Sequence, residues 1–220
     1  MSGKANYWSF LMAMPALCLS VLPVQAATLH ASVQGAKNQP LKDAVVYAIP
    51  TGGSQTKRGR GTRVTIDQKN KEFIPYVMAV NVGTAVDFPN YEQIRHQVYS
   101  FSPSKSFEIP LYKGKPAKPI VFDKPGVVAI GCNIHDWMSA YVFVSETPYF
   151  AVTGADGEVT IKGVPAGTYT VRVWHPTQAD PPEQTGRRVV LKAKSSLSFS
   201  VTQKPVWRPW RAPSASPRGY

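Results

Sequence analysis

A cysteine, a histidine and a methionine stand three residues apart in the stretch GCNIHDWM, residues 131 to 138. They are Cys132, His135 and Met138, which offer a thiolate, an imidazole and a thioether. A copper site built for electron transfer uses a thiolate and two imidazoles in one plane, with a weak thioether on the axis. The stretch therefore supplies three of the four ligands of such a site, and a second histidine must come from elsewhere.

The cysteine has no evident disulfide partner. The chain contains two cysteines, and Cys18 lies in an amino-terminal segment that we expect to be removed. In an oxidising compartment, a lone thiol is a liability unless it is buried, catalytic or bound to a metal. A buried structural cysteine is the alternative interpretation of Cys132, and His135 and Met138 would then be core residues.

Three histidines remain as candidates for the second imidazole: His30, His96 and His175. His96 is the best of them, because it lies in DFPNYEQIRHQVYSFS where a turn leads into a predicted strand. His30 is not the first residue after either expected cleavage point, which disfavours a site built on an amino-terminal histidine. His175 falls at a predicted strand end, and we expect it to be a hydrogen-bonded structural residue.

The elements that must position these residues are strands. Apolar residues alternate with polar or small ones along most of the chain, and 16 glycines and 20 prolines fall mostly between the runs as turn signals. The alternating sets are Val64 and Ile66; Val80 and Val82; Val86 and Phe88; Val128, Ile130 and Cys132; Tyr169, Val171 and Val173; and Leu197, Phe199 and Val201. The sequence predicts an all-β protein with two small sandwiches.

The two ends of the chain share one domain pattern. Pro40-Leu41 precedes an apolar strand, and an Asp156-Gly157 turn and a Pro165-Ala166-Gly167 turn frame a predicted hairpin. These pieces resemble the two ends of one carboxypeptidase-regulatory-like domain, an Ig-like sandwich. We therefore predict a split sandwich over residues 27–61 and 147–201, with a second domain over residues 62–146 inserted into it.

The inserted domain resembles the cupredoxins, the blue-copper fold of plastocyanin, pseudoazurin and amicyanin, which is a Greek-key β-sandwich. The resemblance rests on the VNVGTAVDFPN run before the histidine, on the Phe122 to Gly126 approach to the cysteine strand, and on the short Cys-x-x-His-x-x-Met loop, which has amicyanin-like spacing. Similar exported proteins are often labelled methylamine-utilisation or plastocyanin-like proteins.

The resemblance implies a ligand set for one type 1 copper ion: His96 and His135 as imidazoles, Cys132 as thiolate and Met138 as the axial thioether. It also implies that His135 is the electron port, with Ile134 and Trp137 either in a docking rim or in local packing. One position departs from the family, because Gln97 stands where cupredoxins commonly have an asparagine that braces the ligand loop. Asn133 is our candidate for a replacement brace. Zinc is disfavoured because a thioether is a poor zinc ligand.

The first 26 residues read as a secretory signal, with Lys4, a short apolar run and a cleavage point expected after Ala26 or Ala27. No other stretch has the roughly 20 apolar residues of a transmembrane helix. We therefore expect a periplasmic or otherwise secreted protein. Lys and Arg outnumber Asp and Glu by 25 to 13, but an exported chain rarely meets nucleic acid, so we do not expect that partner.

Many basic residues collect in a loop (Lys57, Arg58, Arg60 and Arg63) and in a tail over residues 202–220 (Lys204, Arg208, Arg211 and Arg218). The tail also holds Trp207 and Trp210 and has no alternation, so it is expected to be disordered. Two interpretations of the charge stay open. It is either solvated chain or a means of attracting an acidic partner or an anionic envelope surface.

The sequence predicts a one-electron carrier between redox partners, such as a c-type cytochrome or a dehydrogenase, and not an enzyme. Multicopper oxidases and copper nitrite reductases need further histidine-rich sites, for which only His30 and His175 are left. A binuclear copper site needs two cysteines in the loop, where Cys132 stands alone. The alternative is a copper-binding or envelope-interaction protein whose flanking sandwich binds proteins or glycans.

Overall fold

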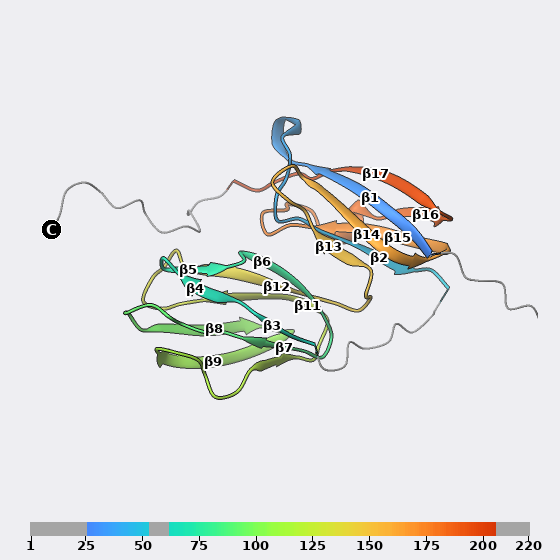
Figure 1. Cartoon of the computed structure of the whole chain (residues 1–220). Coiled ribbons are helices and arrows are strands. Elements are labelled where there is room, and N and C mark those ends of the chain that lie inside the picture. Colours follow the sequence, from blue (N-terminus) through green and yellow to red (C-terminus); the bar gives the residue numbers. More distant parts are fainter. Residues whose placement is uncertain (1–25, 53–61, 206–220) are drawn as a thin grey trace, which may run out of the picture.

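The computed structural model describes residues 26–52 and 62–205, which form β-strands and two short 3₁₀ helices. Figure 1 shows two bodies of strands, one lying on the other. The all-β prediction is confirmed, and so is the presence of a second sandwich beside the one that carries the candidate ligands. None of the described helices has the length and apolar character needed to cross a membrane.

The first sandwich combines strands from both ends of the described chain. One sheet has the order β14-β1-β17 and the other has the order β13-β2-β15-β16. The elements of this body are β1 (Ala26–Gln34), η1 (Ala36–Asn38), β2 (Val45–Pro50), β13 (Phe150–Val152), β14 (Glu158–Pro165), β15 (Gly167–Trp174), η2 (Pro182–Thr185), β16 (Arg187–Leu191) and β17 (Lys194–Ser200). β1 therefore pairs with strands that follow it by more than 120 residues.

Alternation along each strand builds the core of this sandwich. In β1, Ala27, Leu29, Ala31 and Val33 are buried, and the residues between them are exposed or half-buried. Successive side chains of a strand point to opposite faces, so this pattern turns one face of β1 toward the other sheet. The core that results draws its members from residues 27–48 and 149–201.

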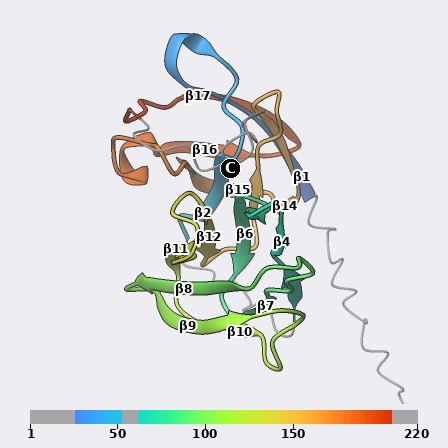
Figure 2. The same ribbon diagram turned by 90° about the vertical axis from the view of Figure 1, so that its left-hand side faces the viewer.

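The second sandwich contains the candidate ligands. Its large sheet has the order β6-β12-β11-β8-β9, its small sheet has the order β10-β7-β3, and β4 and β5 form a separate hairpin. The strands are β3 (Arg63–Thr65), β4 (Asp67–Lys69), β5 (Glu72–Ile74), β6 (Val77–Asn81), β7 (Thr84–Asp87), β8 (His96–Ser102), β9 (Lys105–Tyr112), β10 (Ile120–Phe122), β11 (Gly126–Gly131) and β12 (Ser139–Ser145). Figures 1 and 2 place β8 and β9 on the side away from the first sandwich.

Aromatic side chains fill the space between these sheets. Phe88 and Phe122 are fully buried, and the ring of Phe107 lies 5.9 Å from the first and 6.2 Å from the second, measured between centroids. Cys132 and Met138 belong to the same hydrophobic cluster. The candidate ligand loop is therefore continuous with the core and is not a loose surface segment.

A third apolar cluster joins the two sandwiches. Trp174 of β15 packs against Phe143 of β12 with ring centroids 5.6 Å apart, and Phe143 packs against Tyr47 of β2 at 4.9 Å. Tyr141 meets Trp174 edge-on at 5.8 Å. Buried aromatic pairs of this kind add stability beyond the area that they remove from water. This seam fixes the two bodies against each other.

The expected domain limits, 27–61 with 147–201 and 62–146, stay a prediction. The signal segment before residue 26, most of the basic loop and the tail beyond Pro205 lie outside the described residues, and so do Cys18, Trp207 and Trp210. The first tail residues are described. The side-chain amide of Gln203 donates to Oγ1 of Thr177 at 2.9 Å.

We expect the first sandwich to lose stability in mild acid through His175. Burial lowers the pKa of His175 to about 4, and its Nδ1 accepts a hydrogen bond from the backbone N–H of Thr177 at 3.2 Å. The unfolded chain, with an ordinary imidazole, binds the proton more readily. The stabilisation that depends on a neutral His175 is therefore complete above about pH 6.5 and disappears as the pH falls toward 4. The total loss in the free energy of unfolding is up to about 3 kcal/mol.

Urea unfolding at a series of pH values measures this effect. His175→Asn keeps an acceptor beside Thr177 but does not titrate, so its stability should fall less than that of the unsubstituted protein between pH 6.5 and 4. His30→Asn, at an exposed histidine of the same sandwich, should leave the slope unchanged. Equal slopes for His175→Asn and the unsubstituted protein would contradict the assignment.

Candidate metal centre

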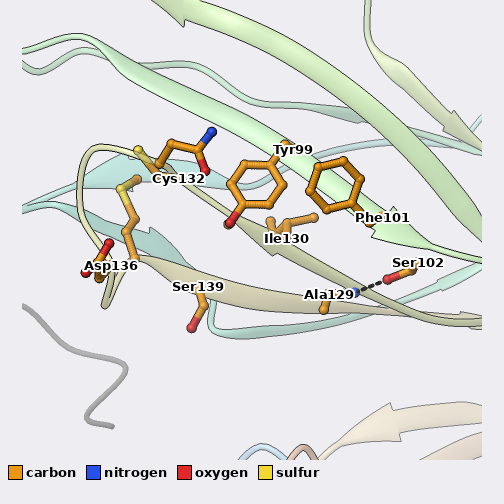
Figure 3. Close-up of a pocket in the computed structure, with 11 residues that line it drawn as sticks. Tyr99, Phe101, Ser102, Ala129, Ile130, Cys132, Asp136 and Ser139 are labelled. Atoms are coloured by element: carbon orange, nitrogen blue, oxygen red, sulfur yellow. Dashed lines mark hydrogen bonds between the residues drawn. The ribbon is translucent and has the colours of Figure 1, made fainter.

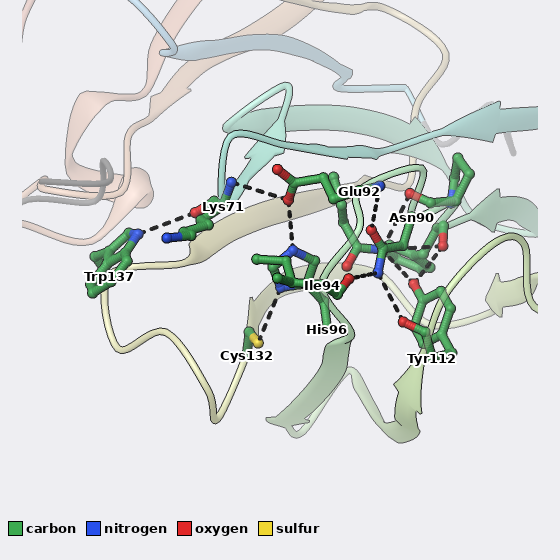
Figure 4. Close-up of polar contacts among 11 residues, drawn as sticks. Lys71, Asn90, Glu92, Ile94, His96, Tyr112, Cys132 and Trp137 are labelled. Carbon is green, nitrogen blue, oxygen red and sulfur yellow. Dashed lines mark hydrogen bonds and ion pairs between the residues drawn. The ribbon is translucent and has the colours of Figure 1, made fainter. Parts of the chain in front are cut away.

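The structure brings three of the predicted ligands together. The ligand atoms of His96, Cys132 and His135 all lie within 4.8 Å of one another. Sγ of Cys132 is 4.0 Å from Nδ1 of His96, and the two imidazole rings have centroids 5.0 Å apart. His96 begins β8, Cys132 follows β11 directly, and His135 lies in the connection to β12. Figure 4 shows His96 and Cys132 facing each other at the ends of their strands.

Strand pairing explains why residues 36 positions apart meet. Gly131 at the end of β11 pairs with Tyr99 of β8 and with Ser139 of β12. The loop over residues 132–138 must therefore close within the width of one hairpin. Two backbone hydrogen bonds tighten it: the N–H of Cys132 donates to the carbonyl of Met138 at 3.2 Å, and the N–H of Met138 donates to the carbonyl of His135 at 2.9 Å.

The fourth predicted ligand, Met138, lies in the same hydrophobic cluster as Cys132. Its side chain is 1% exposed and packs in the core of the second sandwich. Met138 and Cys132 also line one open cavity of about 450 Å³ on the outer side of the loop. Met138 therefore lies in the core beside Cys132, in the region where an axial thioether would be needed.

Tyr99 lines the same cavity, and Figure 3 shows its ring between Cys132 and Phe101. Its ring lies so close to Gly131 that a Cβ on that residue would be 3.0 Å from the ring carbon Cζ and from the hydroxyl oxygen. The ring of Phe101 packs against that of Tyr99 in a tilted arrangement, with centroids 5.2 Å apart. A side chain at position 131 would therefore press on the outer end of the Tyr99 ring, which would have to shift to make room.

The imidazole of His135 is prepared to accept a metal. Its Nδ1 is buried and forms no hydrogen bond with any residue in the described ranges. Burial, followed by the electrostatic interactions with His96 and with the ammonium of Lys71, lowers the pKa of His135 below its usual value. A neutral imidazole with an unused, buried nitrogen is a costly arrangement unless a ligand completes it. The donor set therefore fits a metal ion.

Glu92 orients the other imidazole. Nε2 of His96 lies 2.6 Å from Oε2 of Glu92, which leaves Nδ1 directed toward Cys132. Burial tends to raise the pKa of Glu92, but hydrogen bonds from His96 and from the backbone of Lys71 outweigh it, and the pKa is lower than usual. Metal-binding histidines commonly use such a carboxylate to fix their tautomer and ring orientation.

The loop before His96 is held by Asn90. Its side-chain amide donates to the carbonyls of Ile94 at 3.0 Å and Tyr112 at 2.8 Å, and its Oδ1 accepts from the N–H of Glu92 at 3.0 Å. Gln97 takes no part in this brace, because its amide donates to Glu108 at 2.6 Å. The suggested brace by Asn133 is not seen, since Asn133 is exposed.

A second layer of polar groups lies behind this loop. Nε2 of the buried Gln68 donates to the carbonyls of Phe88 at 3.2 Å and Pro89 at 3.3 Å, and it also bonds to the hydroxyl of Tyr112. That hydroxyl donates in turn to the carbonyl of Phe88. The backbone leading to His96 is thus fixed from the β4–β5 hairpin and from β9.

The remaining histidines lie apart from the cluster. His30 and His175 belong to the first sandwich, where His30 contacts Thr160 and His175 contacts Thr177. Sequence analysis missed Glu92, Asn90 and Gln68. The spacing of four residues between Glu92 and His96 was the available signal, but a charged residue in a predicted turn is ordinary, whereas Gln68 carries no signal before the fold is known.

We expect Glu92→Gln to weaken metal binding. An amide cannot hold the imidazole of His96 with a charge-assisted bond, and loss of such a partner typically costs 10-fold or more in metal affinity. A competition titration of Cu(II) against a chelator measures the change. Glu108→Gln, which removes the exposed carboxylate bonded to Gln97, is the matched control and should bind as the unsubstituted protein does. Equal affinities for both variants would show that Glu92 does not orient the ligand.

Comparison with known proteins finds similarity in solved structures alone, because no family model and no curated protein matches the chain. An oxidised amicyanin variant is 18% identical and covers 47% of this chain and 99% of its own, with a TM-score of 0.35. A purple cupredoxin from Nitrosopumilus maritimus is 24% identical, covering 38% and 99%, with a TM-score of 0.33. A copper-containing nitrite reductase from Thermus scotoductus SA-01 is 26% identical, covering 38% of this chain and 22% of its own, with a TM-score of 0.35.

The strand order and the ligand cluster characterise the second sandwich by themselves. A five-stranded sheet packs on a three-stranded one, and the cysteine loop and the histidine strand meet at one end of the core. The carboxypeptidase-regulatory-like identity of the first sandwich stays a prediction. The chain thus contains a cupredoxin-like β-sandwich with a candidate His96–Cys132–His135 copper site.

Proposed function

We propose that this chain is an exported type 1 copper protein that carries single electrons between redox partners. The observation that carries the proposal is the meeting of one thiol and two imidazoles within 4.8 Å, with His96 and Cys132 buried, His135 half-buried and a methionine in the same loop. Within residues 26–52 and 62–205 this is the one group of three or more such side chains placed to hold a metal. A single site of this composition suits electron transfer better than multi-centre catalysis.

The choice of copper follows from the donors. Cys132 supplies a soft thiolate, His96 and His135 supply imidazoles, and Met138 supplies a thioether. Three strong donors with a weak thioether favour copper, whereas structural zinc sites are usually closed by four cysteine or histidine ligands. Bound there, copper would supply the one-electron couple between Cu(I) and Cu(II).

The protein contributes rigidity. His96 is 0% exposed and is held by Glu92, and Cys132 is 3% exposed at the end of a paired strand. Side chains fixed by packing and hydrogen bonds cannot move far when the charge at the site changes, so little energy is spent on rearrangement. An apolar surround with few hydrogen bonds also tunes the potential of such a site.

His135 is the group through which we propose that electrons enter and leave. It is half-buried, in contrast to the fully buried His96, and Trp137 lies beside it with ring centroids 5.3 Å apart. Ile134 is 54% exposed on the same loop. These residues would form the apolar docking rim for a redox protein, such as a c-type cytochrome or a dehydrogenase. The net charge of +12 for the whole chain favours an acidic partner.

Export is proposed from the amino-terminal segment, whose charged start, short apolar run and Ala26 match a cleaved signal. The unpaired thiol of Cys132 is compatible with an oxidising compartment, because it is buried. A metal would protect it further, since a coordinated thiolate is less open to oxidation.

Adding Cu(II) to the mature protein should produce an intense blue or green thiolate-to-copper absorption band. Cys132→Ser should abolish the band, because the serine oxygen cannot replace the thiolate. Visible absorption measures the band, and circular dichroism confirms that both proteins are folded. Absence of the band in the folded, unsubstituted protein with a reduced thiol would exclude the type 1 site.

A further inference from the structure

The turn of the β4–β5 hairpin lies between the two loops that carry the candidate ligands. Asn70 and Lys71 form this two-residue turn, with φ of 55° and 58°. Positive φ at both central residues is typical of the type I′ turn of tight hairpins. In such a turn, the second residue keeps its own N–H and C=O available for contacts outside the hairpin.

The backbone N–H and C=O of Lys71 both form hydrogen bonds, each to a different ligand loop. The N–H of Lys71 donates to Oε2 of Glu92 at 3.2 Å, the same oxygen that lies 2.6 Å from Nε2 of His96. The C=O of Lys71 accepts from Nε1 of Trp137 at 3.2 Å. Trp137 in turn packs beside His135. Figure 4 shows this chain of contacts running from Trp137 through Lys71 and Glu92 to His96.

The hairpin that presents Lys71 is itself firmly attached. Phe73 of β5 is 1% exposed in the core, and Gln68 of β4 is 2% exposed and bonds to the backbone of residues 88 and 89. The N–H groups of Ile66 and Gln68 also donate to the carbonyls of Asp87 and Pro89. The turn therefore cannot shift without moving the segment that leads to His96.

We infer that the turn at Asn70 and Lys71 is a clasp that ties the His96 loop to the Cys132–Met138 loop, and that Lys71 and Trp137 are positioning residues for the metal centre. The N–H of Lys71 connects through Glu92 to His96, and its C=O connects through Trp137 to His135. The clasp sets the spacing of two imidazoles that come from separate loops. Its effect on copper rests on the proposed function, whereas its effect on loop order does not.

Trp137→Phe tests the clasp in the metal-free protein, because it keeps an aromatic ring and removes the indole donor. If the two loops are tied through Lys71, loss of one end should loosen the other. Hydrogen exchange measured by NMR should then show the amide proton of Lys71 exchanging about fivefold faster, the change expected for loss of one neutral hydrogen bond. Trp174→Phe, the same chemical change at the seam between the sandwiches, should leave that exchange rate unchanged.

The same variants test the effect on the metal. Trp137→Phe should lower Cu(II) affinity about fivefold and shift both the thiolate-to-copper band and the reduction potential, neither of which a general loss of stability would move. Lys71→Arg keeps the peptide groups of this residue and the positive charge near His135, so its affinity should stay within about twofold.

The outcomes separate cleanly. Unchanged exchange at Lys71 in Trp137→Phe would overturn the clasp. A loss of affinity in Lys71→Arg as large as that in Trp137→Phe would assign the effect to the lysine side chain and would also overturn the clasp. If the unsubstituted protein gives no thiolate-to-copper band, the proposed function fails, and the exchange measurement alone decides the clasp.

Discussion

The arrangement of this molecule depends on strand register at one point, where β11 pairs with β8 on one side and β12 on the other. Gly131 is the residue that makes both pairings, and Cys132 follows it directly. His96, Val98 and Ser100 share the buried face of β8. A slip of one residue along β8 would turn all three side chains to the opposite face. The hydrophobic pattern that sets the register therefore also aims the imidazole at the thiol.

Holding polar groups at the end of an apolar core is costly, and the second sandwich limits this cost by pairing them. Asn90 satisfies three backbone groups, Gln68 bonds to two carbonyls, and Glu92 accepts from an imidazole and a peptide N–H. A buried network of this kind rigidifies a site when its members are satisfied. Among the described residues of the second sandwich, two buried side-chain atoms have no hydrogen-bond partner: Oε1 of Gln68 and Nδ1 of His135. The second of these is where a metal would complete the set.

Much of this could be predicted from the sequence, for identifiable reasons. Alternation with period two predicted strands throughout, because a half-buried strand records its two faces in the order of its residues. The spacing of Cys132, His135 and Met138 is local, so a single loop displays it. His96 could be chosen among few candidates because it follows a turn and begins an alternating run. The strand order, in contrast, follows from contacts between distant residues that no local pattern encodes.

The supporting residues could not be predicted in the same way. Lys71 acts through its peptide groups, which every residue possesses, so its side chain says nothing of its role. Gln68 and Asn90 are ordinary turn and strand residues until their neighbours are known. The expectation about Asn133 was wrong because a brace was sought next to the ligands in the sequence, whereas the brace reaches the loop from Asn90, six residues before His96.

The insertion of one sandwich into the other has a consequence for synthesis. β1 and β2 lie in different sheets and do not pair with each other; their partners are β13, β14, β15 and β17, all beyond residue 149. Because the chain is made from its amino terminus, β1 and β2 have no partners until the residues of the second sandwich have been made. The inserted domain can thus fold, and hold its ligands, before the outer one closes. The outer sandwich is therefore the last part of the chain to fold, because its sheets form only after the inserted domain has been made.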